Sequence, residues 1–249
     1  MNTLTISDLT IGYGHHTVAC HLDATLRSGT LACLIGRNGT GKSTLLRTLG
    51  GFLPPLHGRV SIGGEEISSM ARGPLSRLVS VVLTHRPDVR QLTVAEVVAL
   101  GRTPYTGLWG TLSANDERIV SESIGTVGIS HLAERHIGTL SDGECQKVMI
   151  AKALAQQTSV ILLDEPTAFL DYPSKRETLL LMRRIAASGK AVLLSTHDME
   201  MALRLADTLW LMTSSHKLLC GSRDYLHDSL LPASSFWLNE RACQYPQDE

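Results

Sequence analysis

Short runs of apolar residues recur along the chain, and segments with apolar residues at helical spacing follow several of them. The runs predict buried strands at residues 31–35, 79–83, 160–163, 191–194 and 209–212. Helical spacing predicts helices directly after residue 44, at 174–188 and at 199–205. Strands that alternate with helices are typical of a mostly parallel sheet covered on both faces.

The first 30 residues show a different pattern, because Leu4, Ile6, Leu9 and Ile11 have polar neighbours. This alternation predicts short antiparallel strands, and residues 60–62 with the glycines after them predict another strand and a tight turn.

From residue 85 to residue 157 the pattern is mainly helical, with Thr93 and Ser113 as candidate N-caps. Between these helices we expect a loop over residues 101–110 with exposed aromatics, Tyr105 to Trp109. The fold class predicted is α/β, a mostly parallel sheet core with an N-terminal antiparallel β part and an inserted helical subdomain. The single domain would comprise this core (1–84 and 158–222), the helical subdomain (85–157) and a C-terminal tail (223–249).

Net charge, cysteine content and the length of the apolar stretches limit the classes of function that the protein can have. The 249 residues carry a formal net charge of -1, which gives no electrostatic case for binding nucleic acid. The cysteines are odd in number and scattered, which suits a reducing cytosol, and we expect Cys33 to be a core residue. The five cysteines are Cys20, Cys33, Cys145, Cys220 and Cys243. The N-terminus has no signal-peptide pattern, and no apolar stretch approaches roughly 18 residues. We therefore expect any membrane role to come through a partner.

Residues 36–44 have the spacing G-x-x-x-x-G-K-[ST] of a phosphate-binding P-loop, between a predicted strand and a predicted helix. This loop predicts that the α/β core is a P-loop NTPase core, which binds nucleotide. Such a loop presents backbone N–H groups to an anion, Lys42 adds a positive charge for the β- and γ-phosphates, and Ser43 offers a hydroxyl to Mg²⁺. The alternative is an ordinary strand–helix turn with a chance lysine. The candidate ATP-binding residues are Gly36, Arg37, Asn38, Gly39, Thr40, Gly41, Lys42, Ser43 and Thr44.

Two acidic residues, Asp164 and Glu165, follow the apolar run at 160–163. At the carboxyl end of a strand, Asp164 can hold Mg²⁺ opposite Ser43, and Glu165 can polarise the attacking water. The alternative is a solvated acidic turn after a core strand.

A histidine, His197, follows the strand predicted at 191–194 and its continuation Ser195-Thr196. It could contact the γ-phosphate and hold Glu165 and water in line. The alternative is a helix-capping Thr–His turn.

The segment 140–144 contains the pattern S-x-x-E, in which Ser141 and Glu144 form a capping box for the helix that follows. A helix N-terminus with serine and glycine also binds anions. From these residues alone, the structural cap is the favoured interpretation.

Together, the P-loop, 140–144, 162–166, 168–171 and 195–198 resemble the ATP-binding subunit of an ATP-binding cassette (ABC) transporter. The resemblance covers residues 3–213 and implies ATP and Mg²⁺ as cofactors and catalysis by Lys42, Glu165 and His197. It implies a head-to-tail homodimer, in which the signature residues of one subunit face the γ-phosphate held by the other. The signature residues are Ser141, Asp142, Gly143 and Glu144. Asp171 would lie at the dimer seam, and Tyr13 would stack on adenine, although Tyr13 alone is equally explained as a turn residue.

Two residues depart from the family pattern. Asp142 stands where the family usually has glycine, which adds a negative charge near the phosphates. Aspartate tolerates positive φ better than most residues, if that position needs it. Thr84 stands at the Q-loop position, where the family usually has a glutamine that binds Mg²⁺ and senses the membrane partner.

The stretch 94–105 resembles the iron–siderophore, haem and vitamin B12 importer branch; alternatively, it only packs the helical subdomain. The resemblance implies membrane-spanning permease subunits and, indirectly, a substrate-binding protein as partners. It places the chain on the cytoplasmic face of the inner (plasma) membrane, held there by the permease. Two other functions stay open: a soluble ABC-type ATPase on ribosomes or DNA, and a nucleotide-sensing interaction module.

Overall fold

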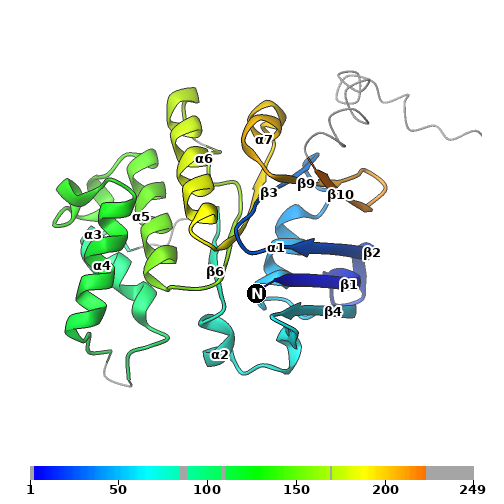
Figure 1. Ribbon diagram of the computed structural model, residues 1–249, viewed down its shortest axis with the longest axis horizontal. Coiled ribbons are helices and arrows are strands. Elements are labelled where there is room, and N and C mark those ends of the chain that lie inside the picture. The colour runs from blue at the N-terminus through cyan, green and yellow to red at the C-terminus, as the bar shows by residue number, and fades with distance from the viewer. Residues whose placement is uncertain (1–2, 85–88, 108–109, 169, 223–249) are drawn as a thin grey trace, which may run out of the picture.

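The computed structural model describes residues 3–84, 89–107, 110–168 and 170–222. Two sheets form in this part of the chain, one antiparallel and one mostly parallel. Figure 1 shows the antiparallel strands at one end of the molecule, helices α3–α5 at the other, and the parallel sheet between them. The predicted α/β class is confirmed. The predicted tail at 223–249 and the aromatic residue Trp109 lie outside the described residues.

The antiparallel sheet has the order β2-β1-β4-β5 among the described strands. Its strands are β1 (Leu4–Tyr13), β2 (His16–Leu26), β4 (His57–Ile62) and β5 (Glu65–Glu66). The predicted alternation is confirmed, since Leu4, Ile6, Leu9 and Ile11 of β1 are all buried. One face of this sheet therefore closes a hydrophobic core.

The larger sheet has the order β10-β9-β3-β8-β7-β6 among the described strands. Its strands are β3 (Leu31–Gly36), β6 (Val79–Val82), β7 (Val160–Leu163), β8 (Ala191–Thr196), β9 (Thr208–Met212) and β10 (Leu218–Ser222). Five of them are parallel, and the edge strand β10 runs antiparallel to β9. The sequence predicts the five parallel strands but not β10.

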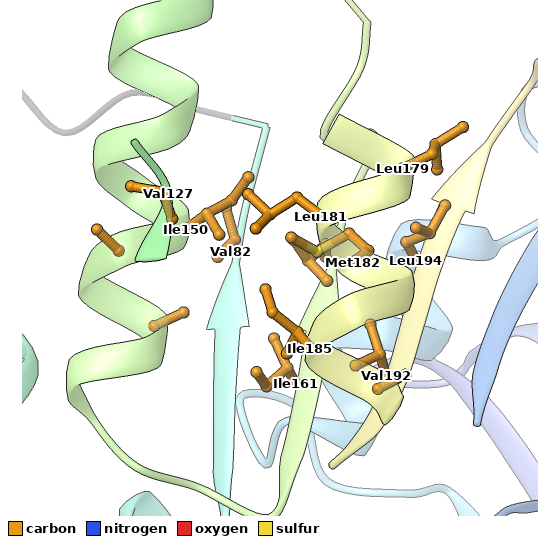
Figure 2. Close-up of a cluster of buried hydrophobic side chains, with 14 of the residues drawn as sticks. Val82, Val127, Ile150, Ile161, Leu179, Leu181, Met182, Ile185, Val192 and Leu194 are labelled. Carbon is orange, nitrogen blue, oxygen red and sulfur yellow. The ribbon is translucent and has the colours of Figure 1, made fainter. Parts of the chain in front are cut away.

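Both faces of the parallel sheet are covered, which explains why its strands are continuous apolar runs. In β3, Leu31, Cys33 and Ile35 join one hydrophobic core, while Ala32 and Leu34 join the other. Helix α1 and the antiparallel sheet contribute to the second core. Residues of α3, α4, α5, α6 and α7 contribute to the first core. Figure 2 shows side chains of α6 packed over strands β7 and β8.

The helices are α1 (Lys42–Leu49), α2 (Arg72–Ser76), α3 (Val94–Ala99), α4 (Ala114–Thr126), α5 (Asp142–Ala155), α6 (Tyr172–Ala187) and α7 (Met199–Leu205). Short 3₁₀ helices are η1 (Ile67–Ser69), η2 (Leu100–Arg102), η3 (Ser130–Leu132) and η4 (Ile137–Thr139). Every described element between β6 and β7 is helical. No helix among the described residues combines the length and the apolar character needed to cross a membrane.

Helix ends follow the capping signals. Thr93 and Ser113 cap α3 and α4, as predicted, and the structure shows that each belongs to a capping box. Helix α6 begins at Tyr172, earlier than the predicted residue 174, because the Asp171 side chain caps it. The expected loop at 101–110 is wrong at its start, where η2 includes Gly101 and Arg102. Tyr105 is exposed, as expected, and its ring stacks on the Arg102 guanidinium, with 4.0 Å between the guanidinium carbon and the ring centroid.

Candidate functional site

Four neighbouring parallel strands end at the same edge of the sheet, in the spatial order β3, β8, β7 and β6. The P-loop follows β3, His197 follows β8, Asp164 and Glu165 follow β7, and Thr84 follows β6. Ligands of open α/β sheets bind at the carboxyl ends of the strands. The pairing of the strands thus brings the candidate residues, which are far apart in the sequence, to one edge.

The P-loop joins β3 to α1 with a tight backbone turn. Gly41, the N-cap of α1, has φ of 106°, which favours glycine. A Cβ atom on Gly41 would lie 2.6 Å from Cγ1 of Val18, so a side chain would not fit. Glycine at this position therefore adds no side chain at the α1 N-terminus, where an anion would bind.

The Lys42 side chain lies inside the loop, and the residue is 5 % exposed. Its Nζ donates to the carbonyl oxygens of Gly36 at 2.8 Å and Arg37 at 3.1 Å. Burial lowers the pKa of Lys42, an effect that the negative charges of Glu165 and Asp164 oppose. A buried lysine directed into the loop is unlike a chance lysine on an ordinary turn.

The two carboxylates after β7 have different surroundings. Asp164 is 5 % exposed, and its Oδ1 accepts a hydrogen bond of 2.8 Å from Oγ of Ser195. The same Oγ accepts a hydrogen bond of 2.8 Å from the backbone N–H of Glu165. The φ of Glu165, 48°, is uncommon for a non-glycine residue. Asp164 is therefore no solvated turn residue, and strained backbone at Glu165 is typical of functional sites.

Ser195 is a site residue that the sequence analysis did not single out. It is fully buried at the end of β8, where the register pairs Leu163 of β7 with Leu194. This register sets Ser195 beside Asp164. A hydroxyl in a strand that is otherwise apolar was the signal available in the sequence.

His197 faces Glu165, with 3.7 Å between its Nδ1 and Oε2 of Glu165. The helix that follows is capped by Asp198, whose Oδ1 accepts from the backbone N–H of Met201 at 3.1 Å. The cap thus belongs to Asp198, and the imidazole of His197 is left beside the carboxylate.

Thr84 lies directly beyond β6, and its hydroxyl donates to the backbone carbonyl of Asp164 at 3.0 Å. It therefore contacts the backbone of the acidic pair at the edge of the sheet. Its neighbours 85–88 lie outside the described residues.

Tyr13 ends β1 near the P-loop and is 45 % exposed. Its hydroxyl lies 3.4 Å from Oγ1 of Thr44, the last residue of the P-loop motif. An exposed ring at this place is accessible to a nucleotide base, as aromatic stacking requires.

The donor set fits Mg²⁺. Ser43 is exposed at the start of α1, and Asp164 provides a carboxylate. Among the described residues no group of three or more His, Cys, Asp or Glu side chains could hold a metal ion. Mg²⁺ needs no such cage, because it takes one or two carboxylates and completes its shell with water and substrate phosphates.

The segment 141–144 forms the start of α5. Ser141 Oγ accepts from the Glu144 backbone N–H at 3.3 Å, and Glu144 Oε2 accepts from the Ser141 backbone N–H at 2.8 Å. The bonds that the Glu144 carboxylate accepts from the Ser141 backbone N–H and from the Ser141 hydroxyl lower the pKa of Glu144. Asp142 is the first residue of α5 and does not have positive φ. The predicted capping box is confirmed, and Asp142 needs no tolerance for left-handed backbone.

Asp171 caps α6, where its Oδ1 accepts from the backbone N–H of Ser174 at 3.0 Å. Hydrogen bonds from Ser174 lower the pKa of Asp171. Phe169, two residues earlier in the predicted motif 168–171, lies outside the described residues.

The chemistry available at this edge follows from its parts. The loop and Lys42 can hold a polyphosphate, while Glu165 beside His197 can accept a proton from an attacking water. A positively charged cradle next to a carboxylate is the arrangement for hydrolysis of a nucleoside triphosphate.

Comparisons with known proteins give the same answer. Residues 20–168 match the protein family described as ABC transporter. The achromobactin transport ATP-binding protein CbrD of Dickeya dadantii (strain 3937) is 37% identical over 248 residues, which are 99% of this chain and 92% of that protein. The ferric enterobactin transport ATP-binding protein FepC of Escherichia coli (strain K12) is 38% identical over 202 residues, 81% of this chain and 74% of that protein.

The fold is also that of a solved cassette. A bacterial ABC transporter cassette, solved as a dimer, superposes with a TM-score of 0.77 at 23% identity. The match covers 88% of this chain and 98% of that cassette. At this identity the likeness concerns the fold alone.

Proposed function

Because this chain belongs to the ABC transporter family, as an ATP-binding subunit, we propose that it hydrolyses ATP to drive import of metal chelates through a membrane permease. The observation that best supports this proposal is the position of four residues at one edge of the parallel sheet: Lys42, Asp164, Glu165 and His197. The names of the relatives, achromobactin and ferric enterobactin transport proteins, support an iron–siderophore chelate as the substrate, within the wider class of iron–siderophore, haem or cobalamin-type chelates.

In the proposed hydrolysis each residue has a separate task. The P-loop amides and Lys42 bind the β- and γ-phosphates and stabilise the negative charge that develops on them. Glu165 accepts a proton from the water that attacks the γ-phosphate, and His197 orients the Glu165 carboxylate. Ser195 fixes both acidic residues through its two hydrogen bonds.

Mg²⁺ would be held by Ser43 and Asp164 and would neutralise phosphate charge when bound. The bond from Ser195 fixes the orientation of the Asp164 carboxylate before any ion arrives. Support for this role comes from the burial of Asp164 and from its effect on the pKa of Lys42.

We further propose that two copies pair head to tail around ATP. The α5 N-terminus of one copy, with Ser141 and Gly143, would face the γ-phosphate held by Lys42 of the other, and Asp171 would lie at the seam. The anion-binding character of a capped helix N-terminus supports this arrangement. Asp142 and Glu144 add negative charge at the same end, so the contact has to be made through Ser141 and the backbone amides.

A groove beside the helical segment is the proposed docking surface for the permease. It has a volume of about 410 Å³ and lies between the end of α1, α2, β6 and α5. Phe52 lines this groove and is 61 % exposed. Gln156 also lines it, and the backbone oxygen of Gln156 accepts a hydrogen bond of 3.0 Å from the hydroxyl of Tyr105. A large exposed aromatic side chain at a groove is typical of an interaction site. Docking here would hold the chain on the cytoplasmic face of the membrane.

Co-purification tests this function. A tagged chain, extracted from its native membranes in mild detergent, should bring down a membrane permease and, after reconstitution in liposomes, support ATP-dependent uptake of a ferric siderophore. A Phe52→Asp variant should lose most of the permease and retain ATP binding. Failure to recover any membrane permease with the parent would contradict the proposal.

Thr84→Gln is expected to change coupling more than nucleotide binding. A longer carboxamide at this position cannot reproduce the 3.0 Å bond of Thr84 to the Asp164 carbonyl, whereas the P-loop is untouched. We expect the stimulation of ATPase activity by the reconstituted permease to change several-fold, with the Kd for ATP within about two-fold of the parent. Unchanged stimulation and transport would show that Thr84 is not at the coupling point. Thr213→Gln, in the β9–β10 turn, is the matched control.

A further inference from the structure

Gln146 in α5 has a carboxamide whose place in the structure the hydrolysis described above does not explain. Its Nε2 is buried and has no hydrogen-bond partner among the described residues. Buried polar groups in native proteins are nearly always paired, and the exceptions frequently have a functional reason. Helix α5 alone would be served as well by an apolar side chain at this position.

Gln146 lines a small cavity of about 30 Å³, which is room for a single water molecule. Three separate segments form the cavity: the end of β6 with Thr84, helix α5 with Asp142 and Gln146, and the segment after β7 with Glu165. The cavity therefore lies between Gln146 and Glu165, the residue proposed to activate water.

The polar groups around the cavity suit one bridging water. The Thr84 hydroxyl donates its hydrogen to the Asp164 carbonyl, so the hydroxyl oxygen can only accept a further hydrogen bond. The Glu165 carboxylate accepts as well, and the Gln146 amide donates. A water here would accept from Gln146 and donate to Thr84 and Glu165.

Glu165 needs such a contact. Its backbone is held by Ser195, but its carboxylate lies 3.7 Å from His197, which is longer than a hydrogen bond. We propose that Gln146 is a positioning residue for ATP hydrolysis: through one water it links Thr84 to Glu165 and holds the Glu165 carboxylate for proton transfer. This inference rests on the proposed role of Glu165.

The test replaces Gln146 with Met, a helix former of similar size that cannot donate. We expect kcat for ATP hydrolysis by the purified chain to fall about 10-fold, with KM for ATP unchanged. Because Nε2 of Gln146 bonds to no other described residue, its loss breaks no bond from this nitrogen to protein, and the thermal midpoint should stay the same or rise. Gln91→Met, at an exposed glutamine, should leave both quantities at the parental values.

The water bridge makes a second prediction about pairs of variants. Thr84→Val breaks the same bridge and also the bond to Asp164, so adding Gln146→Met to it should lower kcat no further. If the two losses multiply, the residues act independently and the bridge is wrong.

The outcomes separate the inference from its premise. A parent chain without ATP hydrolysis overturns both the proposed function and the role of Gln146. A parent that hydrolyses ATP and a Gln146→Met variant with parental kcat overturn the role of Gln146 alone. A variant with a clearly lower thermal midpoint and an altered KM shows a packing role and overturns it as well.

Discussion

Glu165→Gln is expected to lower ATP turnover by about 100-fold or more and to leave ATP binding intact. The amide keeps the size of the carboxylate and the backbone bond to Ser195, but it cannot accept the proton of the attacking water. Binding depends on the P-loop and Lys42, which the substitution does not touch. Steady-state phosphate release and equilibrium binding of ATP are the two measurements. Glu200→Gln, on the exposed side of α7, is the matched control and should turn over ATP at the parental rate.

The same variant should accumulate as a dimer in ATP, because the closed pair forms and is not reopened by hydrolysis. Light scattering after gel filtration, with and without ATP and Mg²⁺, measures this. Turnover at the parental rate, or a monomer under both conditions, would contradict the assignment of Glu165.

Arg102→Met is expected to be the most destabilising of the substitutions considered, lowering the thermal midpoint by on the order of 10 °C. Arg102 is 3 % exposed, and its guanidinium donates to Asp116 at 2.8 Å, to the Ala155 carbonyl at 2.7 Å and to Gln157 at 3.1 Å. The ring of Tyr105 stacks on it. Removal leaves the Asp116 carboxylate without its cation and the carbonyl without its donor.

Arg118→Met is the matched control, since Arg118 makes an exposed ion pair with Glu122 on α4. Exposed pairs of this kind contribute little, so the thermal midpoint should move by about 1–2 °C at most. Equal shifts for the two variants in a thermal melt would mean that the interactions of Arg102 are not structural.

Acid should act on the same interaction. Hydrogen bonds from Ser113, and then from Arg102, lower the pKa of Asp116 from 3.8 to about 2. A lowered pKa favours the folded state at every pH above 3.8, and this contribution is lost as the pH falls through about 2. In Arg102→Met the pKa of Asp116 should rise, so that acid unfolding begins at higher pH than in the parent.

The sequence predicts the fold well because its signals are local. Apolar runs flanked by turn residues identify β3, β6, β7, β8 and β9, N-cap residues place the starts of α3 and α4, and a capping box places the start of α5. Strand β10 escapes prediction because its residues are largely exposed, and it is defined by pairing with β9.

The site is less predictable, because its contacts depend on strand order. The motifs name Lys42, Asp164, Glu165 and His197, but only the position of β8 between β3 and β7 sets Ser195 beside Asp164. Arg102 illustrates the other limit: an arginine in a predicted loop is ordinarily exposed, and its burial comes from α4 and α5 closing around it.

Pairing of two copies around ATP is the central claim, and mixing two inactive variants tests it most directly. Lys42→Ala disables the P-loop, and Gly143→Asp adds charge to the α5 N-terminus, where a Cβ would meet Leu170 at 3.4 Å and no other described residue within 4 Å. Random pairing makes half of the dimers mixed, each with one intact site of two, so the mixture should recover about a quarter of the parental ATP turnover. If the mixture stays as inactive as the two variants measured apart, the site is completed within one chain and the head-to-tail account is wrong.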